Sequence, residues 1–395
     1  MENRYGGARR EAEKHSDFID LIDTNFHSCG FRYPQTVIHA ATNRYFAGAD
    51  ARQYRPDPAG DPALRAAIAA YYRDAGSSVP HDSSVPADSL VVTASASESY
   101  SHIFAARCSA DDRVLLPRPG YPLFEDIAIR NGLAVDFYDQ RRSADWSIDP
   151  DELGAILRPR TAAIVLISPN NPTGSVISES TIRRIGAICE NRGLFLVVDE
   201  VFSEILFAGS SLPRPAPLLP DVPVYTINGV SKLFASPELK VSWIAVSGPA
   251  DTRGQAVEDL LVQNDLFLSA SSMSQFIAAE MFAGGMEFPR AMAAEIARRR
   301  ELMLGEIARI DGLSAVPPAG GIHVPVEIDP EILPAGADDE EIAVELLLDH
   351  RVAAHPGYLY GMDQPVSLVM SYLAPEDRIL EGMSRIERYL KVRSR

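Results

Sequence analysis

Short apolar runs alternate with longer segments of helical spacing from about residue 90 onward. Seven runs, rich in β-branched residues, are expected to form strands: 90–93, 113–116, 133–138, 162–167, 195–198, 224–227 and 241–246. Helix-like segments stand between several of them: 98–107, 124–131, 149–157 and 179–191. Strands that are apolar on both faces and joined by helical crossovers indicate a mostly parallel sheet buried between helices. The pattern therefore predicts one large α/β domain built on a seven-stranded sheet.

Both ends of the chain depart from this pattern. Residues 1 to about 16 are charged and polar, and we expect them to form a frayed arm. Asp61 followed by Pro62 predicts the N-cap and first position of a helix. Residues 251–311 show the pattern of long helices. After residue 321, four further segments show the pattern of short strands and helices: 322–328, 339–349, 366–372 and 375–389.

We expect three regions from these changes in pattern. Residues 1–45 would form an N-terminal arm and part of a small domain, residues 46–285 the large α/β domain, and residues 286–395 a smaller α+β domain. A chain of 395 residues with 46% hydrophobic residues is long enough for such an arrangement.

Composition narrows the classes of partner and compartment. The formal charge is 37 − 54 = −17, which argues against nucleic acid or an anionic membrane as a partner. The three cysteines lie far apart without a CxxC pair, and no histidine cluster has metal-ligand spacing. The charged first residues do not resemble a signal peptide, and no apolar run is long enough to span a membrane. These features predict a cytoplasmic protein without a metal site.

Two stretches that follow predicted strands carry groups suited to an anionic, oxygen-bearing ligand. In Thr93-Ala-Ser-Ala-Ser-Glu98, small residues let backbone N–H groups and the hydroxyls of Ser95 and Ser97 reach an anion at a helix N-terminus. A plain helix cap is the alternative interpretation. In Ser168-Pro-Asn-Asn-Pro-Thr-Gly174, Asn171 offers an amide donor to a phenolic oxygen at the end of a parallel strand.

Two further residues carry opposite charge. Asp199 ends a buried apolar run, where a carboxylate is costly unless it is paired; a protonated pyridine nitrogen is a suitable partner. Lys232, in a Ser-Lys loop after the next run, offers an amine to an aldehyde and can also move a proton. Tyr121, on a proline-rich turn, could lie on a planar ring; an ordinary half-buried tyrosine is the alternative interpretation. A phosphate, a phenolic oxygen, a ring nitrogen and an aldehyde together describe pyridoxal 5'-phosphate (PLP).

The order of these motifs resembles the class I/II aminotransferases, the fold type I PLP enzymes. The motifs are Thr93–Glu98, Pro119-Gly-Tyr121, Ser168–Gly174, Asp199–Phe202, Ser231-Lys232, Pro317–Gly321 and Pro356–Gly361, and the resemblance covers residues 20 to 390. The resemblance implies a phosphate site formed by Ser95, Ala96, Ser97 and Lys240. It implies ring contacts by Tyr121, Asn171 and Phe202. It also implies that Asp199 pairs with the ring nitrogen and that Lys232, next to Ser231, carries the aldimine. Tyr54 resembles the tyrosine that reaches the phosphate of a neighbouring subunit, which implies a homodimer with shared active sites.

Several positions depart from the family pattern. Phe202 replaces a tyrosine, Lys240 an arginine and Gly229 a hydroxyl residue. Val369 stands where the family carries the arginine that binds the substrate α-carboxylate, and no Arg or Lys lies between Val352 and Asp377. A bidentate arginine–carboxylate contact is strong, so its loss bears on the substrate. A carboxylate would then be absent or be held by other groups, such as Asn25, His27 or Arg32.

The resemblance and its departures imply a homodimeric PLP enzyme that acts on an unusual amino substrate, in specialised metabolism such as antibiotic biosynthesis. Transamination through Lys232 is the leading hypothesis. A carbon–sulfur β-lyase or a decarboxylating oxidative deaminase is the alternative, because some PLP enzymes that process cysteine conjugates of lincosamides resemble aminotransferases. A catalytically silent PLP-binding regulator is the hypothesis from another class.

Overall fold

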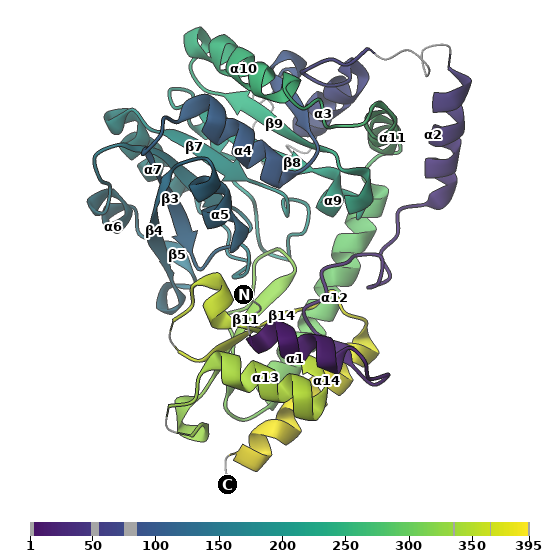
Figure 1. Cartoon of the computed structure of the whole chain (residues 1–395), viewed down its shortest axis with the longest axis vertical. Coiled ribbons are helices and arrows are strands. Elements are labelled where there is room, and N and C mark those ends of the chain that lie inside the picture. Colours follow the sequence, from purple (N-terminus) through teal and green to yellow (C-terminus); the bar gives the residue numbers. More distant parts are fainter. Residues whose placement is uncertain (1–3, 49–54, 75–84, 335, 364, 394–395) are drawn as a thin grey trace.

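The computed structural model describes residues 4–48, 55–74, 85–334, 336–363 and 365–393. These residues form an upper body around a large sheet and a lower body around a small sheet, and the long helix α12 (Glu287–Arg309) runs between them (Figure 1). Among the described residues, none of the helices combines the length and the apolar character that crossing a bilayer requires.

The large sheet has eight strands within the described residues. Their spatial order is β2 (Leu90–Thr93), β9 (Ser242–Ser247), β8 (Val224–Gly229), β7 (Phe195–Asp199), β6 (Thr161–Ile167), β3 (Arg113–Arg118), β4 (Ala134–Arg141) and β5 (Ser147–Ile148). Neighbouring strands from β8 to β4 are parallel, whereas β9 is antiparallel to β2 and β8. All seven predicted strands are present; the structure adds the two-residue β5, too short to leave an apolar run.

Helices cover both faces of the large sheet because its strands are apolar on both sides. Ala163, Val165 and Ile167 of β6 pack with one group of helices, and Ile164 and Leu166 pack with another. The first group is α4 (Ala96–Arg107), α5 (Leu123–Arg130) and α10 (Ala250–Asp265); the second includes α6 (Pro150–Ala155) and α7 (Glu179–Arg192). This is the buried parallel sheet that the sequence pattern predicts.

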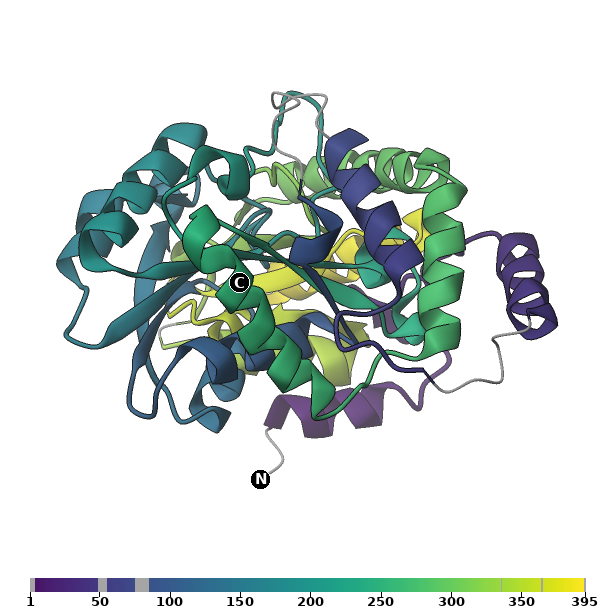
Figure 2. The ribbon, with the colours of Figure 1, turned by 90° about the horizontal axis from the view of Figure 1, so that it is seen from above.

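Further helices surround the antiparallel side of the large sheet. They are α2 (Gln35–Ala47), α3 (Pro62–Asp74), α9 (Val230–Leu233) and α11 (Ser272–Ala283), whereas the short helix α8 (Pro215–Leu218) packs with α7. The side chain of Asp61 accepts hydrogen bonds from the backbone N–H groups of Ala63 and Leu64, which confirms the predicted N-cap. Helix α2 lies at the outer edge of the molecule in both ribbon views (Figures 1 and 2).

The small sheet has the order β10 (Leu313–Ser314), β11 (His323–Ile328), β14 (Ser367–Ser371) and β13 (His355–Pro356). A separate parallel pair joins β1 (Ile19–Asp20) to β12 (Val352–Ala353). Helices α12, α13 (Asp339–His350) and α14 (Glu376–Arg393) contribute to one shared apolar core with these strands. The chain after residue 321 thus alternates strands and helices as its pattern predicts.

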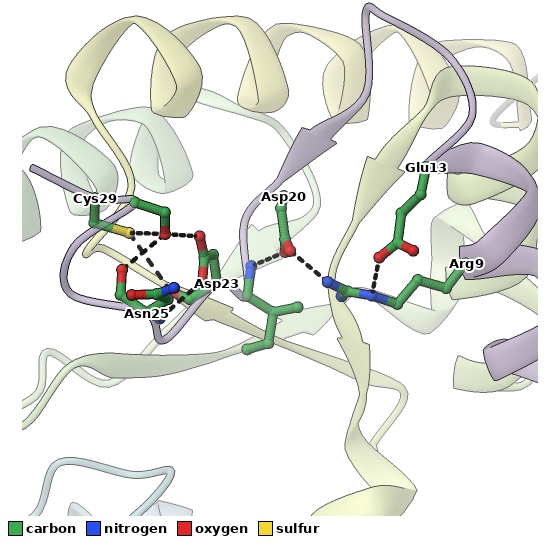
Figure 3. Close-up of polar contacts among 8 residues, drawn as sticks. Arg9, Glu13, Asp20, Asp23, Asn25 and Cys29 are labelled. Atoms are coloured by element: carbon green, nitrogen blue, oxygen red, sulfur yellow. Dashed lines mark hydrogen bonds and ion pairs between the residues drawn. The ribbon is translucent and has the colours of Figure 1, made fainter. Parts of the chain in front are cut away.

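The N-terminal residues differ from the prediction. Residues 4–12 form helix α1 (Arg4–Ala12), and Tyr5, Ala8 and Ala12 are buried in the core of the small domain. Arg9 donates hydrogen bonds to Asp20 at 2.5 Å and to Glu13 at 2.9 Å (Figure 3). The prediction of a frayed arm is therefore wrong for residues 4–12, because a narrow face of small and aromatic residues is buried despite the charges around it.

Candidate active site

A cavity of about 440 Å³ opens between the two bodies. Its floor includes Ile167, Asp199 and Gly229, which end β6, β7 and β8 in turn. Ligands of parallel α/β sheets bind outside the carboxyl ends of the strands, so this is the expected position. The opposite wall comes from the small domain and contains His323 and His355.

Lys232 lies in the short helix α9, directly after strand β8, and lines the cavity. Its Nζ atom lies 5.2 Å from the ring centre of Phe26 and 5.9 Å from that of Phe202. Burial against these apolar rings lowers the pKa of the Lys232 ammonium to about 8. A lysine with such a pKa exists partly as the neutral amine near neutral pH, which is the form that attacks an aldehyde and accepts a proton.

Asp199 is the last residue of β7 and is almost completely buried. The Tyr100 hydroxyl donates to one of its carboxylate oxygens at 3.1 Å, and the Val201 backbone N–H donates to the other at 3.0 Å. Burial raises the pKa of the Asp199 carboxyl to about 6, because no cation of the described part of the chain compensates for the lost hydration. A protonated heteroaromatic nitrogen in the cavity would supply that missing charge.

The sequence predicts that the N-terminus of α4 binds an anion. In the structure, the residues predicted for this site have different positions. Ser95 is the N-cap: its hydroxyl accepts from the Glu98 N–H at 3.1 Å, while the Glu98 carboxylate accepts from the Ala94 N–H at 2.5 Å. Ala96 and Ser97 line the cavity. The plain-cap interpretation thus describes Ser95, whereas the first turn of the helix stays available to an anion.

Gly229 and Ser242 explain one departure from the family pattern. A Cβ atom at Gly229 would lie 2.4 Å from the Ser242 hydroxyl oxygen, so a larger residue there would force the Ser242 side chain to move. Ser242 lines the cavity together with Ser231 and Lys240. The hydroxyl that is missing at residue 229 in the sequence is therefore present beside it, on the neighbouring strand β9.

Asn171 also lines the cavity, and its Oδ1 atom is buried without a hydrogen-bond partner among the described residues. An unpaired buried amide oxygen is costly, so a hydrogen-bond donor of a ligand is the expected partner. Tyr121 and Phe202 line the cavity as well. Tyr54, predicted to reach a neighbouring subunit, lies outside the described residues.

The three residues suggested for a substrate carboxylate do not line this cavity, and neither does Val369. His27 donates a hydrogen bond from Nε2 to the Ala235 carbonyl, 2.8 Å away, and lines a different cavity with Arg32. The Asn25 side chain accepts from the His27 N–H, within the loop drawn in Figure 3. Val369 is completely buried in the core of the small domain.

Sequence reasoning missed several residues of the small-domain wall, including His323, His355 and Tyr360. Each histidine stands alone in an apolar segment, which is the pattern of an ordinary core histidine. Only the pairing of β11 and β13 with β14 brings them to one cavity. Spacing along the sequence carries no signal of that pairing.

The geometry and the comparisons with known proteins agree on the class of protein. A buried acid, a lysine of lowered pKa and an unpaired amide around one cavity suit PLP, and the fold is that of the fold type I PLP-dependent enzymes. The family described as aminotransferase class I and II matches residues 26–384. The chain belongs to this family and is a PLP-dependent enzyme of the aminotransferase type.

Similar proteins include enzymes with different amino substrates in their names. Mouse tyrosine aminotransferase is 25% identical over 77% of this chain and 67% of its own length. The glutamate-pyruvate aminotransferase AlaA of Escherichia coli K12 is 27% identical over 78% of this chain and 76% of its own. A crystal structure of an Escherichia coli aminotransferase has a TM-score of 0.87 at 25% identity and covers 98% of this chain and 94% of its own.

Proposed function

We propose that this enzyme transfers the amino group of an unusual amino substrate that is not held by an arginine–carboxylate contact, as in specialised metabolism such as antibiotic biosynthesis. One observation carries the proposal: among the described residues, no arginine lines the cavity that contains Lys232 and Asp199. Tyrosine and glutamate, named for the relatives, carry α-carboxylates. An anion of that kind needs a compensating cation when it is buried.

The residues of the large domain would hold the cofactor. Ser97, Ser242 and Lys240 would take the phosphate, Asn171 the phenolic oxygen, and Asp199 the ring nitrogen, while Tyr121 and Phe202 would contact the ring. Bound PLP acts as an electron sink for the carbon that carries the amino group. A negatively charged Asp199, held in place by Tyr100 and Val201, favours the protonated ring nitrogen.

Lys232 would serve as the proton carrier of the reaction. Its Nζ atom is buried but not ion-paired among the described residues, and its lowered pKa of about 8 lets it accept a proton near neutral pH and return it. The apolar rings of Phe26 and Phe202 beside it exclude water from the transfer. This assignment makes Lys232 the residue without which the reaction stops.

A screen of amino donors, with and without free carboxylates, tests the proposed function. The PLP-loaded protein is mixed with each donor and its cofactor absorbance is followed, with Lys232→Ala as the inactive comparison. We expect donors without an α-carboxylate to convert the cofactor to its amine form fastest. Faster conversion by common amino acids such as tyrosine or glutamate than by any donor without a carboxylate would overturn the proposal.

The same missing arginine favours a second candidate reaction. A carboxylate that no cation clamps can turn into the position from which carbon dioxide is lost, or a β-substituent can leave, as in a carbon–sulfur lyase or a decarboxylating deaminase. Release of a thiol, pyruvate or carbon dioxide from a cysteine conjugate, without conversion of the cofactor to its amine form, identifies that reaction. The family assignment shows an enzyme, so we do not propose a silent regulator.

We also propose that two copies of the chain assemble with their active sites at the interface. Leu266 and Phe267, after helix α10, are 69% and 67% exposed. Ser269, in the same segment, donates a hydrogen bond to Glu98 at the start of α4, which lines the cavity. A second copy that covered this apolar segment would therefore lie close to the anion end of the site.

Substitution of Leu266 and Phe267 by glutamate tests the assembly. We expect the wild-type protein to be a dimer by light scattering and the double variant to be a monomer with lower affinity for PLP. Glutamate at Leu348, which is 44% exposed on α13, is the matched control and should leave the dimer intact. A monomeric wild-type protein that binds PLP normally would contradict the proposal.

A further inference from the structure

The small-domain wall of the cavity contains a buried polar atom that no protein group satisfies. His323 is 5% exposed, lines the cavity, and its Nε2 atom has no hydrogen-bond partner within the described residues. Leaving a buried donor or acceptor unpaired costs stability, so such atoms in native proteins usually meet a ligand or water. The role of His323 is not explained by the cofactor, whose groups are matched by the large domain.

A second histidine completes this wall. His355 lines the same cavity, and its Nδ1 atom lies 2.9 Å from the Tyr360 hydroxyl. The ring of Tyr5, from helix α1, packs edge-on against the His355 ring at 5.6 Å. The hydrogen bond at Nδ1 and the packing against Tyr5 fix the ring of His355. Its Nε2 atom is then the remaining polar atom of the imidazole. The N-terminal helix thus helps to hold one of the two histidines in place.

Strand register puts both histidines on the same sheet face as Val369. His355 pairs with Val369 across β13 and β14, and His323 pairs with Ser371, two residues further along β14. Paired residues share a face of a sheet, as do residues two apart on one strand. Of these side chains, the two histidines line the cavity, whereas Val369 is completely buried. Imidazoles therefore stand at the end of the cavity where an arginine would otherwise emerge.

The two imidazoles are neutral, so they do not replace an arginine charge. Burial, together with smaller contributions from the nearby Lys232 and His355, lowers the pKa of His323 to about 3. Burial also lowers the pKa of His355 to about 4, with a smaller contribution from Arg9. Tyr360 and Tyr5 also face His355, and burial raises the pKa of both, so each remains an uncharged hydroxyl. Protonating either histidine to bind a carboxylate at neutral pH would cost several kcal/mol.

We propose that His323 and His355 form a neutral hydrogen-bonding anchor that selects a substrate with an uncharged polar group, of the amino alcohol type, in place of the α-carboxylate. The inference deepens the proposed function and rests on it. A hydroxyl both donates and accepts, so it can satisfy either tautomer of each imidazole. A carboxylate only accepts, and it would be buried here without a cation, because Lys232 and Lys240 are committed to the cofactor.

A matched pair of ligands tests this selection on the PLP-loaded protein. 2-Aminoisobutyrate carries the carboxylate, and 2-amino-2-methylpropan-1-ol carries a hydroxyl in its place. Neither has a hydrogen on the carbon bearing the amine, so binding is measured without proton removal. Dissociation constants come from calorimetry and from the cofactor absorbance. Because both ligands meet the same cofactor, the ratio of the two constants isolates the anchor.

We expect the wild-type protein to bind the alcohol at least about tenfold more tightly than the acid, with a ratio that stays constant from pH 6.5 to 8.5. His323→Leu and His355→Leu should each weaken alcohol binding by about five- to tenfold and leave acid binding within about twofold. His323→Gln keeps a polar group near the Nε2 position and should restore most of the alcohol affinity. His350→Leu, on α13 outside the cavity, is the matched control and should change neither constant.

Three results would overturn the inference. They are equal binding of acid and alcohol, no binding of the alcohol, or a preference for the acid that grows as the pH falls, which would indicate cationic histidines. If His323→Leu does not fold, three measurements still test the inference. They are the ratio of the two dissociation constants in the wild-type protein and the binding of both ligands by His355→Leu and by His323→Gln. Failure of the proposed function looks different: common amino acids such as tyrosine or glutamate would then convert the cofactor faster than any donor without a carboxylate, whatever the histidine variants do to ligand binding.

Discussion

The two walls of the cavity differ in charge and in their relation to the family. The large-domain wall contributes Asp199, Lys232 and Lys240. These residues suit a ring nitrogen, an aldehyde and a phosphate, respectively. The small-domain wall contributes the neutral groups His323, His355 and Tyr360. Under the proposed function, the comparison teaches that the type of reaction and the choice of substrate are encoded in separate parts of this fold. The large-domain wall has the charged groups that the family motifs predict, whereas the small-domain wall has neutral groups where the motif predicts an arginine.

Removing the amine on the large-domain wall should have the largest effect. We expect Lys232→Ala to lower the rate of amino transfer by at least about 10³-fold, because the proton carrier is lost. Steady-state rates with the best donor of the screen measure this loss. Lys391→Ala, on the solvent side of α14, is the matched control and should retain wild-type rates. If the rate of amino transfer by Lys232→Ala lay within tenfold of the wild-type rate, Lys232 would not be the proton carrier.

Adding a charge to the small-domain wall should change the substrate. We expect Val369→Arg combined with His323→Ala and His355→Ala to bind 2-aminoisobutyrate at least about tenfold more tightly, because the new guanidinium gains room to reach the carboxylate. Calorimetry on the PLP-loaded variant measures the gain. Val369→Arg alone should be destabilised by about 3 kcal/mol, because residue 369 is completely buried. Equal binding by the single and triple variants would contradict this account.

The buried lysine should reduce the stability of the PLP-free protein. Lys232 has a folded pKa of about 8, below its ordinary value of 10.5, so the unfolded chain binds more protons between these pH values. Wild-type stability should therefore rise as the pH increases from 8 to 10.5 and be lowest, for this group, below pH 8. Lys232→Met should raise the free energy of unfolding by about 2 kcal/mol at pH 7.

Urea unfolding at pH 7 and pH 10 measures this effect. The stabilisation by Lys232→Met should shrink by more than half at the higher pH. Lys391→Met should change the free energy of unfolding by less than about 0.5 kcal/mol at both pH values. A gain from Lys232→Met that is equal at pH 7 and pH 10 would show that the amine is not desolvated in the folded protein.

The smallest predicted effect concerns the support of Asp199. The hydrogen bond from Tyr100 lowers the pKa of Asp199, so Tyr100→Phe should raise that pKa and weaken the pairing with the ring nitrogen. We expect PLP affinity to fall about fivefold at pH 7, measured by titrating the PLP-free protein. Tyr138→Phe removes a hydroxyl that donates to the Val165 carbonyl and is the matched control. Equal PLP affinity in the two variants would show that the Tyr100 hydroxyl does not support cofactor binding.

The large sheet could be predicted closely because its strands are buried on both faces and leave continuous apolar runs. The predicted strand at 90–93 coincides with β2, and the one at 195–198 ends one residue before β7. Helix α1 could not be predicted in the same way. Its buried face is only Tyr5, Ala8 and Ala12, and the apolar signal of two alanines is weak beside the four charged residues of the same helix.

The residues of the site also differ in how far they could be predicted from the sequence. Asp199, Asn171 and Lys232 lie in local motifs, so their chemistry can be predicted from short stretches of sequence. His323 and His355 act through the pairing of strands that are far apart in the chain, which no local spacing reveals. Ser242 was missed for a similar reason, since its role depends on the close approach of Gly229 on the neighbouring strand.

The attachment point of the cofactor tests the central claim most directly. PLP-loaded protein is reduced with borohydride, digested and analysed by mass spectrometry. We predict a single pyridoxyl group on the Nζ atom of Lys232, and none in protein that carries Lys232→Ala. A label on another lysine, or no covalent label in protein that retains PLP, would contradict the assignment of this cavity as the active site.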